Sequence, residues 1–238
     1  MMTTTPRVDF RDLPTWLRDA HEKMMVPRKK AIENHPFTLA MQNGSAEPRH
    51  AERYFSGLMW HLLSFGQHVA FLEKKRPAAV GEFLKGRSED KDGDTDILGR
   101  IVTAFGGPMR KIVEKPWTYE PPPVWSRHDA FLRSAIYSTD LAWQVGAAAL
   151  NVGIESLVPT MVEPLFQASI KNYGVTSHAA EWLASRSGEA EKQHGENGYA
   201  LLREFVPEGD RLLQEQCVFY IDLLSDSMAY GLLESGIK

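Results

Sequence analysis

The sequence is poor in cysteine. Its single cysteine, Cys217, excludes an internal disulfide framework and fits a reducing compartment, so we expect a cytoplasmic protein. Neither sign of charge dominates, since the net charge is −4 at pH 7, and this gives no reason to expect nucleic acid or a membrane as partner. Residues 1–11 also lack the apolar run of a secretory signal.

Long uninterrupted apolar runs are missing as well. The most apolar stretch extends from Leu141 to Val162, and its only formal charge is Glu155. Gln144, Asn151 and other polar residues interrupt it, whereas a membrane-spanning helix needs about 18 or more consecutive apolar residues. The stretch therefore predicts a helix buried in a protein core.

No segment shows the alternating pattern of a β-strand, and apolar residues recur at helical spacing along the chain. No domain linker or internal repeat is evident, so residues 1–238 are expected to form one all-α bundle. Three prolines make residues 117–125 an extended connection, and residues 88–96 read as a solvated loop. We expect helices over residues 12–27, 37–42, 48–75, 96–113, 126–157, 160–173, 178–206 and 210–235.

Three of these helices carry metal-binding residue types on an apolar face. In the helix over 48–75, His61 and His68 are two turns apart on one apolar stripe. Glu155 shares a face with apolar residues, where a lone carboxylate is costly unless it is paired, protonated or bound to metal. Glu191 and His194 form a Glu-x-x-His pair, which four-helix di-iron proteins use to offer two ligands to one centre.

Each feature also has a purely structural interpretation. A histidine on an apolar face is more often a hydrogen-bonded core residue than a ligand, and Glu155 could pair with Arg133 or another base. Taken together, imidazole and carboxylate groups from three helices are the ligand mix of iron, manganese or zinc.

Three motifs follow one another in the second half of the chain: Gly-Ile-Glu-Ser-Leu-Val-Pro over 153–159, Tyr-Gly-Val over 173–175 and Glu-Lys-Gln-His over 191–194. In kind and order, these motifs resemble those of the haem-oxygenase-like di-iron oxidases. The resemblance spans about residues 48–206 and implies a haem-oxygenase-like helical bundle. It also implies that His68, Glu155, Glu191 and His194 are iron ligands, with Glu155 bridging two metals.

Two positions depart from the family pattern. His61 stands where the family has a glutamate, and Ser187 stands where it has the first histidine of the last ligand helix. His61 can still bind a metal, whereas Ser187 is a poor ligand. The resemblance therefore leaves one iron or two irons per chain open, with manganese as a substitute.

Other proteins with this scaffold give alternatives. Residues 31–44 faintly resemble true haem oxygenases, but Lys29 falls where the haem-binding histidine would be, so neither haem nor haem degradation is expected. Thiaminase-II-like and pyrroloquinoline-quinone-synthase-like proteins are metal-free. The former need a nucleophilic cysteine, for which Cys217 is badly placed.

The resemblance implies an oxidase or oxygenase that activates O₂ on a small molecule, such as an amino acid or fatty acid derivative. Glu155 would be the central catalytic group, and Leu62, Phe65 and Trp143 would line the substrate pocket. A homodimer is compatible with the sequence. The alternative is a metal-free or degenerate protein of this fold that binds a small ligand or a partner protein.

The departure at Ser187 generates a prediction. Ser187→His should raise the iron content of reconstituted protein, because it restores an imidazole one helical turn before Glu191. Elemental analysis of wild type and variant measures this. An unchanged iron content would mean that position 187 does not face the metal.

Overall fold

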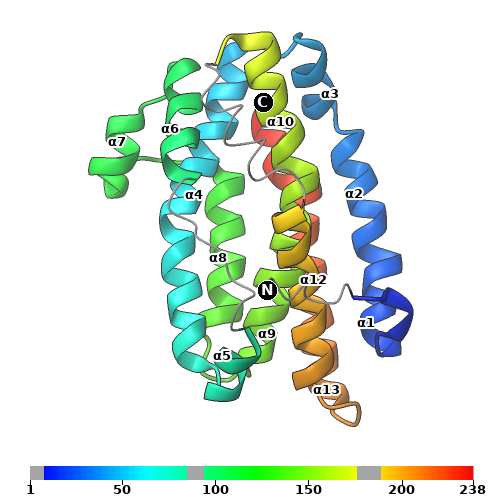
Figure 1. The fold of residues 1–238 in the computed structure, drawn as a ribbon. Helices are drawn as coiled ribbons and strands as arrows, with labels where there is room; N and C mark the ends of the chain where they lie inside the picture. The colour runs from blue at the N-terminus through cyan, green and yellow to red at the C-terminus, as the bar shows by residue number, and fades with distance from the viewer. Residues whose placement is uncertain (1–7, 85–93, 176–188, 238) are drawn as a thin grey trace, which may run out of the picture.

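A computed structural model describes residues 8–84, 94–175 and 189–237 of the chain. Within these residues every regular element is a helix and none is a strand. The long helices run side by side along one axis and form a bundle (Figure 1). The expectation of an all-α protein is confirmed.

The elements follow one another with short connections. Several helices contain segments of the wider π-helix or end in tighter 3₁₀ turns, which are given η labels. In chain order the elements are η1 (Phe10–Asp12), α1 (Thr15–Ala20), η2 (His21–Met25), α2 (Val26–Glu33), α3 (Pro36–Asn43), α4 (Pro48–Lys75), α5 (Ala78–Leu84), α6 (Asp94–Ala104), α7 (Met109–Glu114), η3 (Pro116–Thr118), α8 (Pro123–Tyr137), α9 (Trp143–Ala147), η4 (Ala148–Glu155), α10 (Val158–Tyr173), α12 (Glu189–Phe205), α13 (Arg211–Asp226), η5 (Ser227–Gly231) and η6 (Leu232–Gly236).

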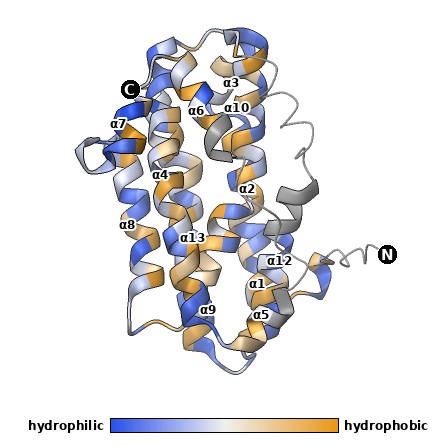
Figure 2. Cartoon of the chain, turned by 60° about the vertical axis from the view of Figure 1, so that its left-hand side comes forward, coloured by the Kyte–Doolittle hydropathy of each residue, from blue (hydrophilic) through white to orange (hydrophobic). Residues whose placement is uncertain are grey.

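Helix α4 has the bounds that its sequence pattern predicts. Pro48 occupies the first turn, where its missing N–H would have no partner, and Pro77 follows the helix end. Tyr54, Leu58 and Leu72 of the predicted stripe are buried. Like α8 and α13, the helix carries both hydrophobic and hydrophilic residues (Figure 2), as expected for an element packed on one side.

Large aromatic side chains fill the space between α4 and α8. Trp125 is fully buried, and its ring lies over Gly57: a Cβ at residue 57 would stand 2.3 Å from the indole nitrogen. The Tyr54 ring packs edge-on against the indole at 5.5 Å between centroids. Glycine at 57 is therefore what lets a tryptophan fill the gap between the two helices.

The single helix expected over 126–157 is wrong. Helix α8 ends at Tyr137, and α9 begins at Trp143. The Lys75 ammonium group closes the turn by donating hydrogen bonds to the carbonyl oxygens of Ser138 at 2.6 Å and Leu141 at 2.9 Å. Polar backbone groups that a helix would pair internally are thus satisfied by a side chain from α4.

Pro27 bends the first long helix without breaking it. The π-helical η2 ends two residues before Pro27, and α2 continues directly from it. Proline has no N–H and collides with the preceding turn, so a locally wider turn before it removes the clash. Pro159 likewise lies in the first turn of α10 and opens that helix.

The apolar segment from Trp143 to Tyr173 is long enough to cross a membrane, but 72% of its most apolar window is buried inside the protein. It packs as a core element, as expected from its interrupting polar residues. Part of the expected loop over 88–96 and the first part of the expected helix over 178–206, which includes Ser187, lie outside the described residues.

The contact between Gly57 and Trp125 generates the second prediction. Gly57→Ala should destabilise the protein by about 1–3 kcal/mol, because the added methyl group overlaps a rigid buried ring. Gly66→Ala on the same helix is the matched control, since no atom lies within 4 Å of its Cβ, and it should stabilise by about 0.5–1 kcal/mol. Urea denaturation measures both. A Gly57→Ala protein as stable as wild type would show that the contact between residue 57 and the Trp125 ring can relax at no cost in the free energy of unfolding.

Candidate functional site

His68 and Asp129 form the centre of a buried polar cluster between α4 and α8. His68 is 1% exposed, and its Nε2 lies 2.8 Å from Oδ1 of Asp129. The carboxylate can only accept, so Nε2–H donates, and Nδ1 of a neutral ring accepts from the Tyr137 hydroxyl at 3.1 Å. The Ser64 hydroxyl lies 3.0 Å from the same carboxylate oxygen. Both ring nitrogens of His68 thus have protein partners.

His61 lies beside this cluster, and its ring nitrogens make fewer hydrogen bonds than those of His68. It is 4% exposed, and its Nδ1 is 3.7 Å from Asp129 Oδ1, which is too long for a hydrogen bond. Neither of its ring nitrogens has a hydrogen-bond partner within the described residues. The His128 ring lies 5.1 Å away between centroids; its Nδ1 is 3.0 Å from the Ser227 hydroxyl, whereas its Nε2 has no partner there.

Electrostatics within the cluster favour a charged carboxylate and an uncharged His128. Burial by itself raises the pKa of Asp129, but the neighbouring His61 and His68 outweigh this and lower the pKa well below its usual value. Burial, with His61 adding to it, lowers the pKa of His128 well below the usual histidine value. A negative Asp129 therefore stands among imidazoles at neutral pH.

Asp129 and His128 were not among the predicted site residues. His128 is fully buried, although its polar sequence neighbours favour a surface or helix-capping position. The signal was present in the sequence: both residues follow Trp125 by one turn and precede Leu132 by one turn, on the apolar stripe of α8. Arg133, the alternative partner for Glu155, lies 4.0 Å from Asp129 and over the Tyr137 ring.

Glu155 is placed at the end of the π-helix η4. Its side chain belongs to a residue only 8% exposed, and Oε2 accepts a hydrogen bond from Nδ2 of Asn151 at 3.0 Å. π-Helical turns are rare and concentrate at functional sites, because they shift side chains out of the regular helical register. The predicted carboxylate thus lies in the interior, at the end of the longest π-helical segment of the described residues.

Helix α12 approaches η4 closely at the level of Glu155. A Cβ at Gly195 would lie 2.8 Å from the Cα of Ser156, and one at Gly198 would lie 2.7 Å from the Cβ of Asn151. Two glycines on one face of α12 therefore allow the backbones to come together. Glu191 lies about one turn before this contact and His194 directly before it on the same helix, but their side chains lie outside the described residues.

The residues expected to line a substrate pocket lie in different places. Phe65 contacts the His61 ring at 5.7 Å between centroids, so it borders the histidine cluster. Trp143 packs edge-on against Phe205, and Leu62 is half-buried against the core. Their role in substrate binding stays a prediction.

Cys217 is unsuited to nucleophilic chemistry. The residue is fully buried, and burial raises the pKa of its thiol to about 12. A thiolate is the reactive form, so a thiaminase-II type of reaction through Cys217 finds no support here.

Solved structures share this fold. Comparison by sequence finds no matching protein family and no matching curated relative. By structure, the chain is similar to a TenA homolog from Pseudomonas syringae, with a TM-score of 0.76 and 16% identity over 98% of this chain and 97% of the other. It is also similar to a domain of unknown function with a heme oxygenase-like fold from Shewanella denitrificans, with a TM-score of 0.68 and 14% identity over 92% and 91% of the two chains. The fold is haem-oxygenase-like, as the sequence motifs implied.

Within the described residues, no three histidine, cysteine, aspartate or glutamate side chains are arranged to hold a metal ion. This statement does not cover two of the five predicted ligands, Glu191 and His194, because their side chains lie outside the described residues. The predicted ligand set therefore stays a prediction.

The cluster around Asp129 generates the third prediction. Asp129→Asn should cost about 1.5–3 kcal/mol at pH 7, because it removes the charge from a buried hydrogen bond to His68. The folded-state pKa of Asp129 is lowered, so its stabilisation is present above the unfolded pKa of about 3.9 and fades as the pH falls below that value. Denaturation at pH 7 and pH 3 should show a difference that shrinks at the lower pH.

Asp19→Asn is the control, since Asp19 makes an exposed ion pair with Lys23. It should change the free energy of unfolding by less than about 1 kcal/mol. An Asp129→Asn protein as stable as wild type at pH 7 would show that the carboxylate charge does not stabilise the cluster.

Proposed function

We propose that the protein is a non-haem iron oxidase or oxygenase that acts on a small molecule. Glu155, Glu191 and His194 would hold the iron, and His61 and His68 would complete the ligand set for one or two metals. The observation that supports this most is the placement of Glu155: a buried carboxylate at the end of a π-helix, directly against the helix that carries Glu191 and His194.

The predicted ligands differ in how available their donor atoms are for binding iron. His61 fits best, because both of its ring nitrogens are buried and lack protein partners within the described residues. Glu155 offers carboxylate oxygens in the interior, and Asn151 fixes one of them. His68 fits least, since it would have to give up its bond to Tyr137 or to Asp129 in order to bind a metal.

The chain's own residues would orient and shield the reaction. Bound iron would supply the binding and activation of O₂. Asn151 would hold the Glu155 carboxylate in one orientation, as outer hydrogen bonds do for metal ligands. Leu150, Val152 and Ile154, all buried on η4, would exclude water from the reacting atoms.

The second candidate function is metal-free binding of a small ligand. The similarity to a TenA homolog favours it as much as the iron-dependent function. So does His68, because its two protein hydrogen bonds are those of a structural core histidine. Iron binding separates the two candidates.

The fourth prediction concerns iron. Protein reconstituted anaerobically with ferrous iron should bind at least one equivalent per chain, and both His194→Ala and Glu155→Gln should lose it, since each removes a ligand. Elemental analysis after desalting measures the iron content. Glu204→Gln is the matched control. It changes an exposed carboxylate on α12, the helix that carries His194, and should leave the iron content unchanged.

Thermal melts of the metal-free proteins add a second readout for Glu155. If iron is its partner, metal-free Glu155→Gln should be as stable as wild type, because no buried base loses its counter-charge. A variant that is destabilised by about 3 kcal/mol and still binds iron would make Glu155 a structural residue. If the wild-type protein binds no iron, the iron-dependent function is wrong and metal-free binding of a small ligand becomes the favoured function.

A further inference from the structure

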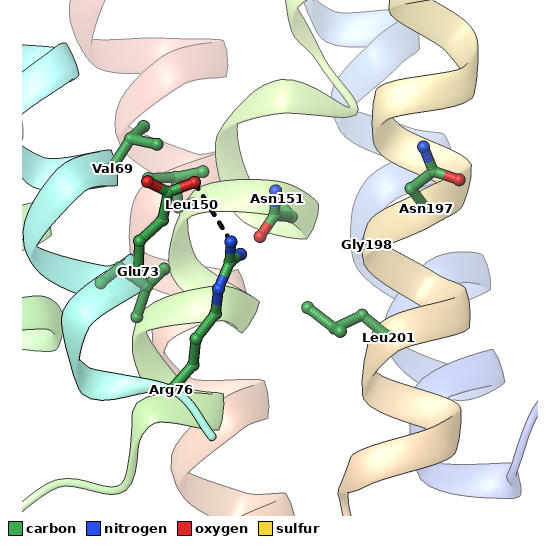
Figure 3. A pocket seen from close by; sticks show the side chains of 9 residues that line it. Val69, Glu73, Arg76, Leu150, Asn151, Asn197, Gly198 and Leu201 are labelled. Atoms are coloured by element: carbon green, nitrogen blue, oxygen red, sulfur yellow. Dashed lines mark hydrogen bonds and ion pairs between the residues drawn. The ribbon is translucent and has the colours of Figure 1, made fainter. Parts of the chain in front are cut away.

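A small cavity lies between α4, η4 and α12, next to Asn151 (Figure 3). Its volume is about 60 Å³, and a single water occupies roughly 10–15 Å³ on this measure, so it holds several waters or a ligand of a few heavy atoms. Nothing in the mechanism above uses it. Its lining residues include Leu72, Glu73, Arg76, Asn151, Asn197 and Leu201.

The polar part of the lining is one cation beside one anion. Arg76 donates from Nη2 to Oε1 of Glu73 at 3.1 Å, one turn earlier on α4. In Figure 3 the guanidinium group of Arg76 reaches into the space between Glu73 and Asn151. A guanidinium carries five N–H donors, and this is its one hydrogen bond in the described part of the chain, so donors remain to grip a planar carboxylate.

Burial of its cation distinguishes this pair from an ordinary surface pair. The Arg76 side chain is 19% exposed, whereas Arg110, in a similar intrahelical pair with Glu114, is 88% exposed. The two carboxylates, Glu73 and Glu114, are equally exposed, at 53%. Exposed pairs of this kind contribute little, and solvent satisfies their remaining donors. Arg76 instead turns its donors toward a cavity, where a bound ligand would replace that solvent.

The cavity is connected to the proposed metal site through one residue. Asn151 lines the cavity, and its Nδ2 also donates to Oε2 of Glu155 at 3.0 Å. A ligand held at Arg76 would therefore lie one side chain away from the Glu155 carboxylate. Such a ligand is placed to be a substrate of that site.

Charge balance selects the kind of ligand. The pair of Glu73 and Arg76 is neutral, so a zwitterion adds no net charge and offers each member a partner of opposite sign. A plain carboxylate would leave Glu73 facing a second anion, and a plain amine would leave Arg76 facing a second cation. Leu72, Leu150 and Leu201 form the apolar part of the wall and suit a short aliphatic side chain.

We propose that this cavity binds a small aliphatic α-amino acid, with its carboxylate on Arg76 and its ammonium group on Glu73. Asn151 lies next to the Arg76 guanidinium group, and Asn197 lines the opposite wall on α12 (Figure 3). The assignment of this amino acid as the substrate rests on the proposed function, whereas its binding does not. It narrows the substrate class to zwitterions and excludes fatty acids.

Calorimetric titration of the metal-free full chain tests the proposal with L-valine as the probe. Isovalerate, which lacks the amino group, and isobutylamine, which lacks the carboxylate, are the matched analogues. Each should bind about tenfold more weakly than L-valine or worse, because each loses a charged hydrogen bond. Arg76→Gln and Glu73→Gln should each weaken L-valine binding by a similar factor, whereas Arg110→Gln should not change it.

The outcomes separate this proposal from the iron-dependent function. L-valine that does not bind at millimolar concentration, or isovalerate that binds as tightly, overturns the amino-acid site whatever the iron content. L-valine that binds through Arg76 and Glu73 in a protein unable to hold iron supports the site and leaves the oxidase function without support. A circular dichroism melt of each variant verifies that it is folded. If a variant does not fold, the affinities of wild-type protein for L-valine, isovalerate and isobutylamine still test the proposal.

Discussion

The architecture depends on the cost of placing ionisable side chains inside an apolar helix bundle. An unpaired charge there costs several kcal/mol, so each must find a partner across a helix interface. Asp129 does so against His68, which joins α8 to α4. Lys75 does so against the carbonyl oxygens of Ser138 and Leu141, which fixes where α8 ends and the chain turns back. Polar pairing thus sets which helices meet and in what register, while the apolar contacts supply most of the driving force.

Glycines that allow close packing are the second feature on which the bundle depends, and two of the three lie next to the proposed site. Gly57 admits the Trp125 ring, which fills the core. Gly195 and Gly198 instead admit the backbone of η4, at its π-helical stretch and next to Glu155. Glycine lowers helix stability by about 0.5–1 kcal/mol per residue, so two in one helix face are a local loss that the tight contact offsets. The arrangement brings Asn151, Glu155 and α12 together in a space too narrow for a larger residue at either glycine.

The sequence predicted the elements whose pattern is local and missed those that depend on distant partners. The apolar stripe of α4, with prolines at both ends, predicted its bounds and the burial of His61 and His68. The break at Tyr137 was missed, because the run after it is compatible with a helix and its partner, Lys75, is far away in the chain. Asp129 was missed although it lies on the apolar stripe of α8, because its partner His68 is far away in the chain. The predicted ligands Glu191 and His194 share one helix, and pattern alone could not show what stands opposite them.

The two polar regions lie at different helix interfaces. Around Asp129, the carboxylate is bonded by His68 and Ser64, and His68 is bonded in turn by Tyr137. These matched bonds stabilise the contact of α4 with α8, whereas both ring nitrogens of the neighbouring His61 lack a hydrogen-bond partner within the described residues. Around Glu155 the irregular helix, the glycine contact and the cavity beyond Asn151 leave room next to a buried carboxylate. A reacting molecule needs such room, and the function that we propose therefore places its reaction at the end of η4.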